Sequence, residues 1–150
     1  MLNQDFMIRK MTERDIDQVM IIELESFSLP WSKQSYLSEL KNSFANYLVC
    51  DSAGEVAGYG GIWVVFEEAH ITNVAIAKNY RCSGMGKALM LALENIARTK
   101  KALSIMLEVR PSNQAARHMY KSLGYIDTGL RKLYYSDNGE DAIIMTKLLT

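Results

Sequence analysis

The stretch from Asn73 to Gly86 limits the fold of this chain more than any other part of the sequence. The apolar run Asn73–Ala77 is typical of a strand, and the polar loop after it carries Arg81, Gly84 and Gly86. An amphipathic helix follows, with apolar residues at roughly helical spacing: Leu89, Leu91, Leu93, Ile96 and Ala97. Glycines let the backbone approach a ligand closely, and unpaired N–H groups at a helix N-terminus favour anions. Strand, Arg-x-x-Gly-x-Gly and helix together predict a turn that binds a pyrophosphate.

Two other nucleotide-binding motifs do not fit this turn. A P-loop needs Gly-x-x-x-x-Gly-Lys-Ser/Thr, but Gly86-Lys87 is followed by Ala88, and Arg81 stands five residues before Gly86. A dinucleotide fingerprint needs Gly-x-Gly-x-x-Gly, and Leu89 occupies the position of its third glycine. A two-glycine turn alone is more often an ordinary tight connection, so its function depends on the rest of the chain.

Length and composition are those of one globular domain spanning residues 1–150. Of the 150 residues, 49% are hydrophobic, and no apolar run approaches the roughly 20 residues of a membrane-spanning helix. The first ten residues lack the basic and then apolar order of a signal peptide, so we expect a cytoplasmic protein without a membrane partner. Seventeen basic residues balance seventeen acidic ones, which gives no electrostatic case for binding nucleic acid.

Apolar periodicity and turn residues predict the order of the helices and strands. The expected strands are Phe6–Arg9, Tyr47–Asp51, Val56–Phe66, Ala69–Ala77, Leu103–Val109, Tyr125–Tyr135 and Ala142–Leu148. The expected helices follow Thr12, Ser32, Gly84 and Ser112 or Asn113, and end near Ser26, Lys41, Lys100 and Leu123. The glycines Gly58, Gly60 and Gly61 indicate a bulge or a close approach within their strand. Asn138-Gly139 predicts a tight hairpin turn between the last two strands.

Several motifs make the chain similar to a known family. Asn73–Leu89 resembles the acetyl-CoA-binding motif of the GCN5-related N-acetyltransferases, and Met106–Tyr125 (MLEVRPSNQAARHMYKSLGY) resembles the segments that follow it there. With Leu29–Ser32 (LPWS) and Arg131–Met145, the sequence resembles the bacterial ribosomal-protein-alanine N-acetyltransferases of that family. The resemblance covers nearly the whole chain. It implies an α+β fold, with a mostly antiparallel central sheet splayed between its fourth and fifth strands and helices on both faces.

The resemblance assigns acetyl-CoA, as cosubstrate, to the splayed strand and the turn after it, and it implies no metal. The backbone of Val74, Ala75 and Ile76 would pair with the pantetheine arm and help to polarise the thioester carbonyl. The backbone of the turn would hold the pyrophosphate, at Arg81, Cys82, Ser83, Gly84, Met85, Gly86 and Lys87. Arg81 and Lys87 add positive charge, although each is equally explained as a solvated surface residue. Family members often carry a basic residue where this chain has Cys82, so phosphate contacts there are expected to be weaker.

Glu108 is the expected general base. It lies at the end of the apolar strand SIMLEV, and family members carry their base at this Leu-Glu-Val-Arg position. Without the resemblance, it would be interpreted as a surface residue at a strand end. Its carboxylate would take the proton of the acceptor amine, through a water molecule. His70, on the strand that enters the cleft, is an alternative base.

Tyr120 is the expected acid, because the matching motif Met-Tyr-Lys-Ser-Leu-Gly-Tyr would bring its phenol to the leaving thiolate. From helical spacing alone it would be a core aromatic residue beside Met119 and Leu123. Asn113 is expected to cap the helix that carries Tyr120 and, by resemblance, to contact the cofactor.

Trp31, Tyr134 and Tyr135 are each either packing residues or walls of a peptide groove. Five acidic residues would complement a basic peptide tail if they lie at the mouth of the cleft, although such groups usually belong to solvated turns: Glu67, Glu68, Asp137, Glu140 and Asp141.

We therefore expect an acetyl-CoA-dependent enzyme that modifies the N-terminal alanine of a small-subunit ribosomal protein. Direct transfer in a ternary complex is expected, because no cysteine stands at the acceptor position: Cys50 is interpreted as a core thiol and Cys82 as a loop residue. One alternative is a relative that acetylates lysine side chains or small amines, for which a closed pocket would be typical. Another is a non-catalytic acyl-CoA-binding module, against which the presence of Glu108 and Tyr120 counts.

Overall fold

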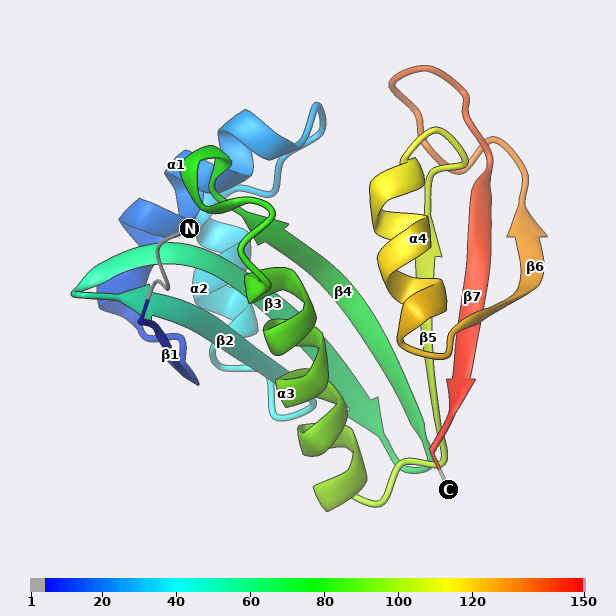
Figure 1. Ribbon diagram of the computed structural model, residues 1–150, viewed down its shortest axis with the longest axis horizontal. Helices are drawn as coiled ribbons and strands as arrows, with labels where there is room; N and C mark the ends of the chain where they lie inside the picture. Colours follow the sequence, from blue (N-terminus) through cyan, green and yellow to red (C-terminus); the bar gives the residue numbers. More distant parts are fainter. Residues whose placement is uncertain (1–4, 150) are drawn as a thin grey trace.

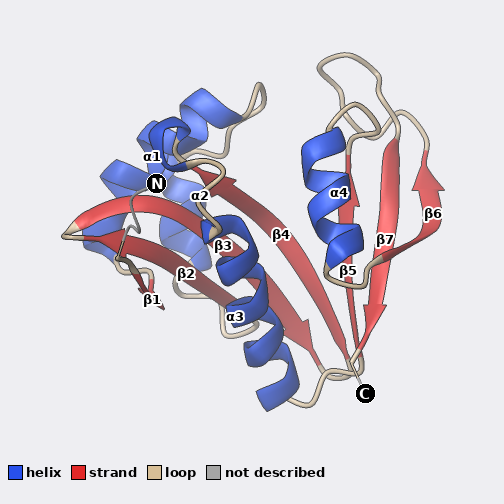
Figure 2. Ribbon diagram, viewed as in Figure 1, coloured by secondary structure: helices blue, strands red, loops and turns tan. Residues whose placement is uncertain are grey.

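The computed structural model describes residues 5–149, and Figure 1 shows their arrangement. In this part of the chain seven strands form one sheet, in the order β1-β2-β3-β4-β5-β7-β6. The strands are β1 (Met7–Lys10), β2 (Ala45–Ser52), β3 (Glu55–Val65), β4 (Glu68–Ile76), β5 (Ser104–Val109), β6 (Ile126–Arg131) and β7 (Ala142–Leu148). The helices are α1 (Ile16–Ser26), α2 (Lys33–Glu39), α3 (Met85–Thr99) and α4 (Gln114–Ser122), with short 3₁₀ turns η1 (Glu13–Asp15) and η2 (Lys78–Tyr80). Every neighbouring pair of strands is antiparallel except β4 and β5, which confirms the predicted α+β fold (Figure 2).

Capping residues explain where the helices begin. The N–H of Thr12 donates to Asp15 Oδ2 at 2.8 Å, and the resulting η1 turn leads directly into α1. Ser32 Oγ accepts an N–H of the first turn of α2 at 3.1 Å, and Asn113 Oδ1 does the same for α4 at 3.2 Å. The long helix α3 starts after Gly84, whose φ of 85° is a left-handed value that glycine adopts without strain. Each of these starts was predicted, and each is confirmed.

Helices cover both faces of the sheet, because its inner strands are apolar on both sides. Along β2, Leu48 and Cys50 belong to the core beneath α3 and α4, whereas Tyr47 and Val49 belong to the core beneath α1 and α2. In Figure 1, α3 and α4 lie in front of the sheet and α1 and α2 behind it. Full burial of each leucine or valine side chain contributes about 1.5–3 kcal/mol, so the two cores hold the sheet between them.

The sheet opens between β4 and β5, as the resemblance implied. These strands pair over three residues only, with Glu68 opposite Ser104 and His70 opposite Met106. Beyond His70 they diverge, and Figure 1 shows two arms that meet at one end and separate toward the other. One arm contains β1 to β4 with α1, α2 and α3, and the other contains β5, β7 and β6 with α4.

The glycine cluster of β3 corresponds to a bulge and a close approach. Gly61 pairs with Asn73 and Ile62 with Ile71, so Thr72 is an extra residue on β4. A Cβ atom on Gly61 would overlap the Tyr47 ring, which explains why glycine stands there. The expected close approach is confirmed, whereas the bulge lies on the neighbouring strand β4, where that strand enters the open part of the sheet.

The expected tight hairpin between the last two strands is wrong. Strand β6 ends at Arg131 rather than Tyr135, and residues 132–141 form a longer loop. Asp141 Oδ1 accepts the N–H of Leu133 at 2.8 Å, and the carbonyl of Tyr135 accepts the N–H of Gly139 at 2.8 Å. Tyr134 and Tyr135 therefore lie on this loop and not in a strand. Within residues 5–149, no helix has both the length and the hydrophobicity to cross a membrane.

Candidate active site

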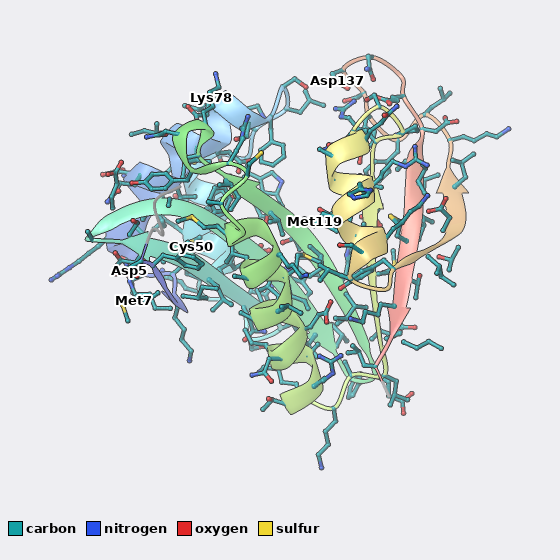
Figure 3. All side chains as sticks on the ribbon, in the orientation of Figure 1. Asp5, Met7, Cys50, Lys78, Met119 and Asp137 are labelled. Atoms are coloured by element: carbon teal, nitrogen blue, oxygen red, sulfur yellow. The ribbon has the colours of Figure 1, made fainter. Side chains whose placement is uncertain are left out.

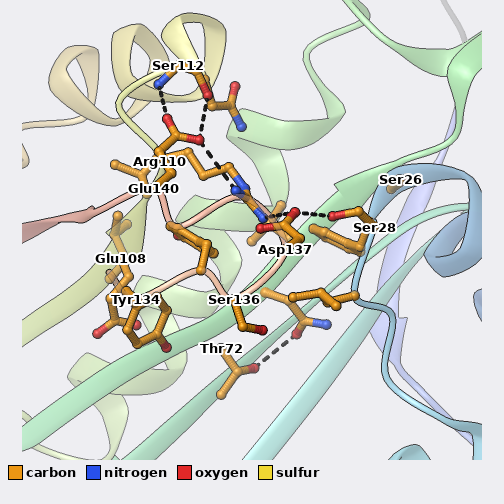
Figure 4. Close-up of a pocket in the computed structure, with 18 of the residues that line it drawn as sticks. Ser26, Ser28, Thr72, Glu108, Arg110, Ser112, Tyr134, Ser136, Asp137 and Glu140 are labelled. Atoms are coloured by element: carbon orange, nitrogen blue, oxygen red, sulfur yellow. Dashed lines mark hydrogen bonds and ion pairs between the residues drawn. The ribbon is translucent and has the colours of Figure 1, made fainter. Parts of the chain in front are cut away.

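A cleft of about 750 Å³ lies where β4 and β5 separate. Its walls come from both arms and from two loops, one between α1 and α2 and the other at residues 132–141 (Figure 4). Of the predicted site residues, seven line this cleft: Trp31, Val74, Glu108, Asn113, Tyr120, Tyr134 and Tyr135. The structure thus brings together the expected base, the expected acid and the expected walls of the peptide groove.

Glu108 and His70, the two candidate bases, are in direct contact. Glu108 Oε1 lies 2.7 Å from His70 Nε2, and Glu108 Oε2 lies 3.6 Å from Arg131 Nε. The pairing of His70 with Met106 explains the contact, since Glu108 is the next residue on the same face of β5. The Glu108 side chain is 9% exposed and the His70 side chain 36% exposed. The two residues are therefore members of one hydrogen-bonded pair rather than independent alternatives.

Tyr120 is both a core aromatic residue and a cleft residue. It belongs to the core beneath α4, where its ring centroid lies 6.0 Å from that of Tyr125, and it also lines the cleft. Burial raises the pKa of the Tyr120 phenol to about 12. The phenol therefore stays protonated at neutral pH and can donate a proton into the cleft.

The predicted pyrophosphate turn continues from β4 onto the first turn of α3. Gly84 is exposed, has a φ of +85°, and has no atom within 4 Å of the place a Cβ would occupy. Gly86 faces α4, because a Cβ there would lie 3.3 Å from Met119 Sδ, the residue labelled between the two helices in Figure 3. Met85 is buried in the core beside them. This open helix start, with the exposed Lys87 beside it, fits the pyrophosphate of acetyl-CoA.

Two of the predicted cofactor-binding residues, Arg81 and Ser83, form hydrogen bonds within the protein. The Ala75 side chain is buried in the core beneath α1 and α2. Arg81 Nε donates to the carbonyl of Ile76 at 3.0 Å, and Ser83 Oγ donates to the carbonyl of Tyr80. Arg81 thus fixes the turn against the end of β4 in addition to supplying charge.

Comparison with known proteins identifies the family. The model of the acetyltransferase (GNAT) family matches residues 16–125, which include the strand, the glycine turn and both Glu108 and Tyr120. The chain belongs to this family. A ribosomal protein bS18-alanine N-acetyltransferase of Escherichia coli K12 is 32% identical over 140 residues, 92% of this chain and 94% of that one. A Bacillus subtilis protein provisionally named for the same activity is 46% identical over 139 residues, 92% of each chain.

Solved structures agree with this assignment. The crystal structure of the ribosomal-protein-S18-alanine N-acetyltransferase from Escherichia coli superimposes with a TM-score of 0.89 and 30% identity, over 97% of this chain and 95% of that one. Arabidopsis thaliana NAA60 in complex with acetyl-CoA has a TM-score of 0.89 over 97% of this chain and 99% of that one at 13% identity, which shows the fold alone. This protein is an N-acetyltransferase with the GNAT fold.

The acidic groups of this acetyltransferase do not form the free cluster that was expected at the cleft mouth. Glu67 and Glu68 lie at the joined end of the arms, where Glu68 pairs with Ser104. Asp137 accepts from Arg110 at 2.7 Å and from the Ser28 hydroxyl, and Glu140 accepts from Arg110 at 3.3 Å (Figure 4). Asp137 and Glu140 are therefore already paired within the protein and are not available as free charges.

Arg110 organises the loop at residues 132–141, a role that the sequence patterns did not indicate. Its guanidinium lies 3.9 Å from the centroid of the Tyr135 ring in addition to its two carboxylate contacts. The backbone N–H and hydroxyl of Ser112 lower the pKa of Glu140, with Arg110 a further cause. Hydrogen bonding from the Ser28 hydroxyl, followed by that from Arg110, lowers the pKa of Asp137. Both carboxylates are consequently ionised, and the loop is anchored, throughout the neutral range.

A buried carboxylate, Glu23, lines the cleft of the acetyltransferase and was not singled out in the sequence. It is 2% exposed and accepts hydrogen bonds from Tyr36, Tyr59 and Trp31. Helical spacing was the signal that could have found it, because Glu23 follows Val19 by four residues on the buried stripe of α1.

Neither cysteine lies among the residues that line the cleft. Cys50 is buried in the core, where burial raises its pKa to about 11, and Cys82 is exposed in the loop before α3. Both interpretations of the cysteines are confirmed.

Proposed function

We propose that this acetyltransferase transfers the acetyl group of acetyl-CoA directly to the α-amine of an N-terminal alanine on a small-subunit ribosomal protein. The observation that carries the proposal is one open cleft lined by Glu108, which is hydrogen-bonded to His70, by Tyr120 and by the aromatic residues Trp31 and Tyr134. The relatives named for ribosomal protein bS18-alanine acetylation supply the acceptor class. A ribosomal substrate would place the reaction in the cytoplasm.

The residues of the chain account for the proton transfers that the reaction needs. When bound, acetyl-CoA supplies the thioester that is attacked. The ammonium of the acceptor has to lose a proton first, and the Glu108 carboxylate, supported by His70, accepts it, directly or through a water molecule. Tyr120 then gives its proton to the thiolate that leaves, and the second proton that the nitrogen loses as the neutral amide forms restores the phenol.

Binding of the cosubstrate would use backbone more than side chains. The N–H groups at the start of α3 would hold the pyrophosphate, helped by the charge of Lys87. The cleft-facing edge of Val74 to Ile76 has no partner on β5, because the two strands pair only up to His70. This edge would bond the pantetheine arm, and Asn113, which lines the cleft at the start of α4, would contact the same arm.

The shape of the cleft favours a peptide acceptor over a small amine. Its mouth is bounded by two loops that belong to different arms, which leaves a groove rather than a closed pocket. Trp31 lies on one loop, and Tyr134, 48% exposed, lies on the other. Aromatic walls of this kind pack against the side chains of an extended peptide.

Mass spectrometry of acetylated peptides tests the proposal. The panel contains peptides that begin with alanine, the same peptides with a blocked α-amine, and peptides whose internal lysines are replaced by arginine. We expect the protein and acetyl-CoA to modify the α-amine of the alanine peptides and to leave the blocked ones unchanged. Modification confined to lysine side chains would contradict the proposed acceptor and support the lysine-acetylating alternative.

A further inference from the structure

Glu23 is a buried charge that the proposed reaction does not use. Its Oε1 atom accepts the Tyr36 hydroxyl at 2.6 Å and the Tyr59 hydroxyl, and its Oε2 atom accepts the backbone N–H of Trp31 at 2.9 Å. No lysine, arginine or histidine within the described part of the chain forms an ion pair with it. A buried carboxylate is costly unless its oxygens are hydrogen-bonded. Three donors meet that need here, and they come from α2, from β3 and from the loop between α1 and α2.

The Tyr36 hydroxyl extends this arrangement to strand β4 of the same arm. While it donates to Glu23, it accepts a hydrogen bond from Asn73 Nδ2 at 2.5 Å. Asn73 Oδ1 in turn accepts the hydroxyl of Thr72, the bulge residue of β4, at 3.0 Å. Trp31, Glu23, Tyr36 and Asn73 therefore form one hydrogen-bonded chain, which we name the Glu23 relay.

The relay joins two parts of the cleft that are distant in the sequence. Trp31 lies on the loop that bounds the groove, whereas Asn73 lies on β4 immediately before Val74, and both line the cleft. Burial raises the pKa of Tyr36 and of Tyr59 far above the ordinary range, so both phenols remain protonated donors. The Trp31 ring also packs on the Tyr36 ring, with centroids 5.2 Å apart. One carboxylate thus links the backbone of the α1–α2 loop, through Tyr36, to the side-chain amide of Asn73 on β4.

We propose that Glu23 and Tyr36 are positioning residues for the acceptor peptide, which set the distance and orientation between the Trp31 wall and Asn73. This inference rests on the proposed function, because it assumes that the acceptor occupies the groove. The backbone of β4 is held by its pairing with β3 and does not depend on the relay. Loss of the relay should therefore weaken acceptor binding, seen as a higher KM, while the affinity for acetyl-CoA stays nearly unchanged.

Tyr36→Phe and Tyr59→Phe form a matched pair that tests the relay. Both tyrosines are 0% exposed and both donate to Glu23 Oε1, but only Tyr36 also bonds Asn73. We expect Tyr36→Phe to raise the acceptor KM about tenfold, which is the worth of one hydrogen bond, and Tyr59→Phe to raise it less than about threefold. Thermal unfolding of each variant measures its structural loss separately, since Tyr36→Phe breaks two hydrogen bonds and Tyr59→Phe one.

Equal KM values in the two tyrosine variants would overturn the inference, since a purely structural role predicts no difference. A loss of acetyl-CoA affinity confined to Tyr36→Phe, measured by calorimetry, would also overturn it. If Tyr36→Phe does not fold, Asn73→Ala breaks the same link from the half-buried cleft side and should give the same rise in KM. In a folded double variant with Tyr36→Phe and Asn73→Ala, the acceptor KM should be no higher than in either single variant, because both changes remove the same hydrogen bond.

A readout independent of activity follows from the Trp31 N–H. In the wild type this amide should exchange slowly with solvent, because it is bonded to Glu23. Glu23→Gln offers one oxygen in place of two and should speed that exchange at least tenfold, and unchanged exchange would contradict the relay. If the wild type acetylates only lysine side chains, the proposed function fails, and the same tyrosine comparison with that acceptor still decides the role of the relay.

Discussion

The two walls of the cleft differ in what they offer a substrate. The β4 wall presents neutral groups, namely Thr72, Asn73 and Val74, together with a strand edge that has no partner on β5 beyond His70. The β5 wall presents ionisable side chains, with Glu108 and Arg110 on the strand and its end and Tyr120 on α4 behind it. The difference indicates a division of tasks, in which one wall binds through its backbone and the other supplies protons and charge. The Glu108–His70 pair lies where the walls meet.

The largest expected effect comes from blocking the glycine turn between β4 and α3, whose backbone is proposed to bind the pyrophosphate. Gly84→Glu should reduce acetyl-CoA binding below detection in calorimetry, because it strains a positive φ and places a negative charge beside the phosphates. Gly54→Glu is a matched control, since Gly54 also has a positive φ, +89°, and open space around its Cβ position, but lies in the β2–β3 turn. Unchanged acetyl-CoA affinity in a folded Gly84→Glu variant would contradict the binding of acetyl-CoA by the backbone on this side of the cleft.

The next effect concerns the base on the β5 wall. Glu108→Gln should lower turnover at pH 7 by about 10²–10⁴-fold, the usual worth of a positioned acid–base group. The deficit should shrink as the pH rises, because the acceptor amine then arrives already deprotonated. An α-amine has a pKa near 8, which places this relief at roughly pH 8–9, whereas a lysine acceptor with a pKa near 10.4 would delay it by about two units.

His70→Gln sharpens the same measurement. Because His70 and Glu108 share a hydrogen bond of 2.7 Å, their substitutions should be non-additive, with the double variant close to Glu108→Gln alone. A Glu108→Gln variant as active as the wild type at pH 7 would transfer the role of base to His70, and with it move the proton chemistry to the β4 wall.

The smallest expected effect belongs to the acid. Tyr120→Phe should preserve packing and lower kcat about tenfold, which is less than the usual worth of an acid–base group. The reason is that a thiol has a pKa near 8.5, so the thiolate leaves without full assistance. Acetyl-CoA affinity should stay within twofold in calorimetry. Equal kcat in wild type and variant would make Tyr120 a packing residue only and leave water as the proton donor.

Local sequence patterns were sufficient to predict most of the helices and strands and the position of the cleft. The capping residues Thr12, Ser32 and Asn113 act within one helical turn, so their sequence signals were reliable. The Asn138-Gly139 signal failed because Arg110, far away in the sequence, binds Asp137 and Glu140 and widens the turn into a loop. Long-range contacts of this kind carry no local signature.

The same limit applies to the chemistry of the site. Glu108 was found from its motif, but its contact with His70 depends on the register of two parallel strands. The Glu23 relay needed hydroxyl donors from two other elements, α2 and β3, so a single acidic residue in α1 gave no sign of it. Motifs therefore led to the proposed reacting groups, whereas the groups proposed to position them followed only from the packed structure.

The parting of β4 and β5 has a consequence for association with other chains. It leaves two strand edges without partners in the interior of the sheet, and such edges are templates to which a strand of another protein can add. The hydrogen bond between Ser28 and Asp137 connects the loops of the two arms (Figure 4). The loops that shape the peptide groove thus also shield the sheet from unwanted strand addition, and loosening them would expose a site for aggregation.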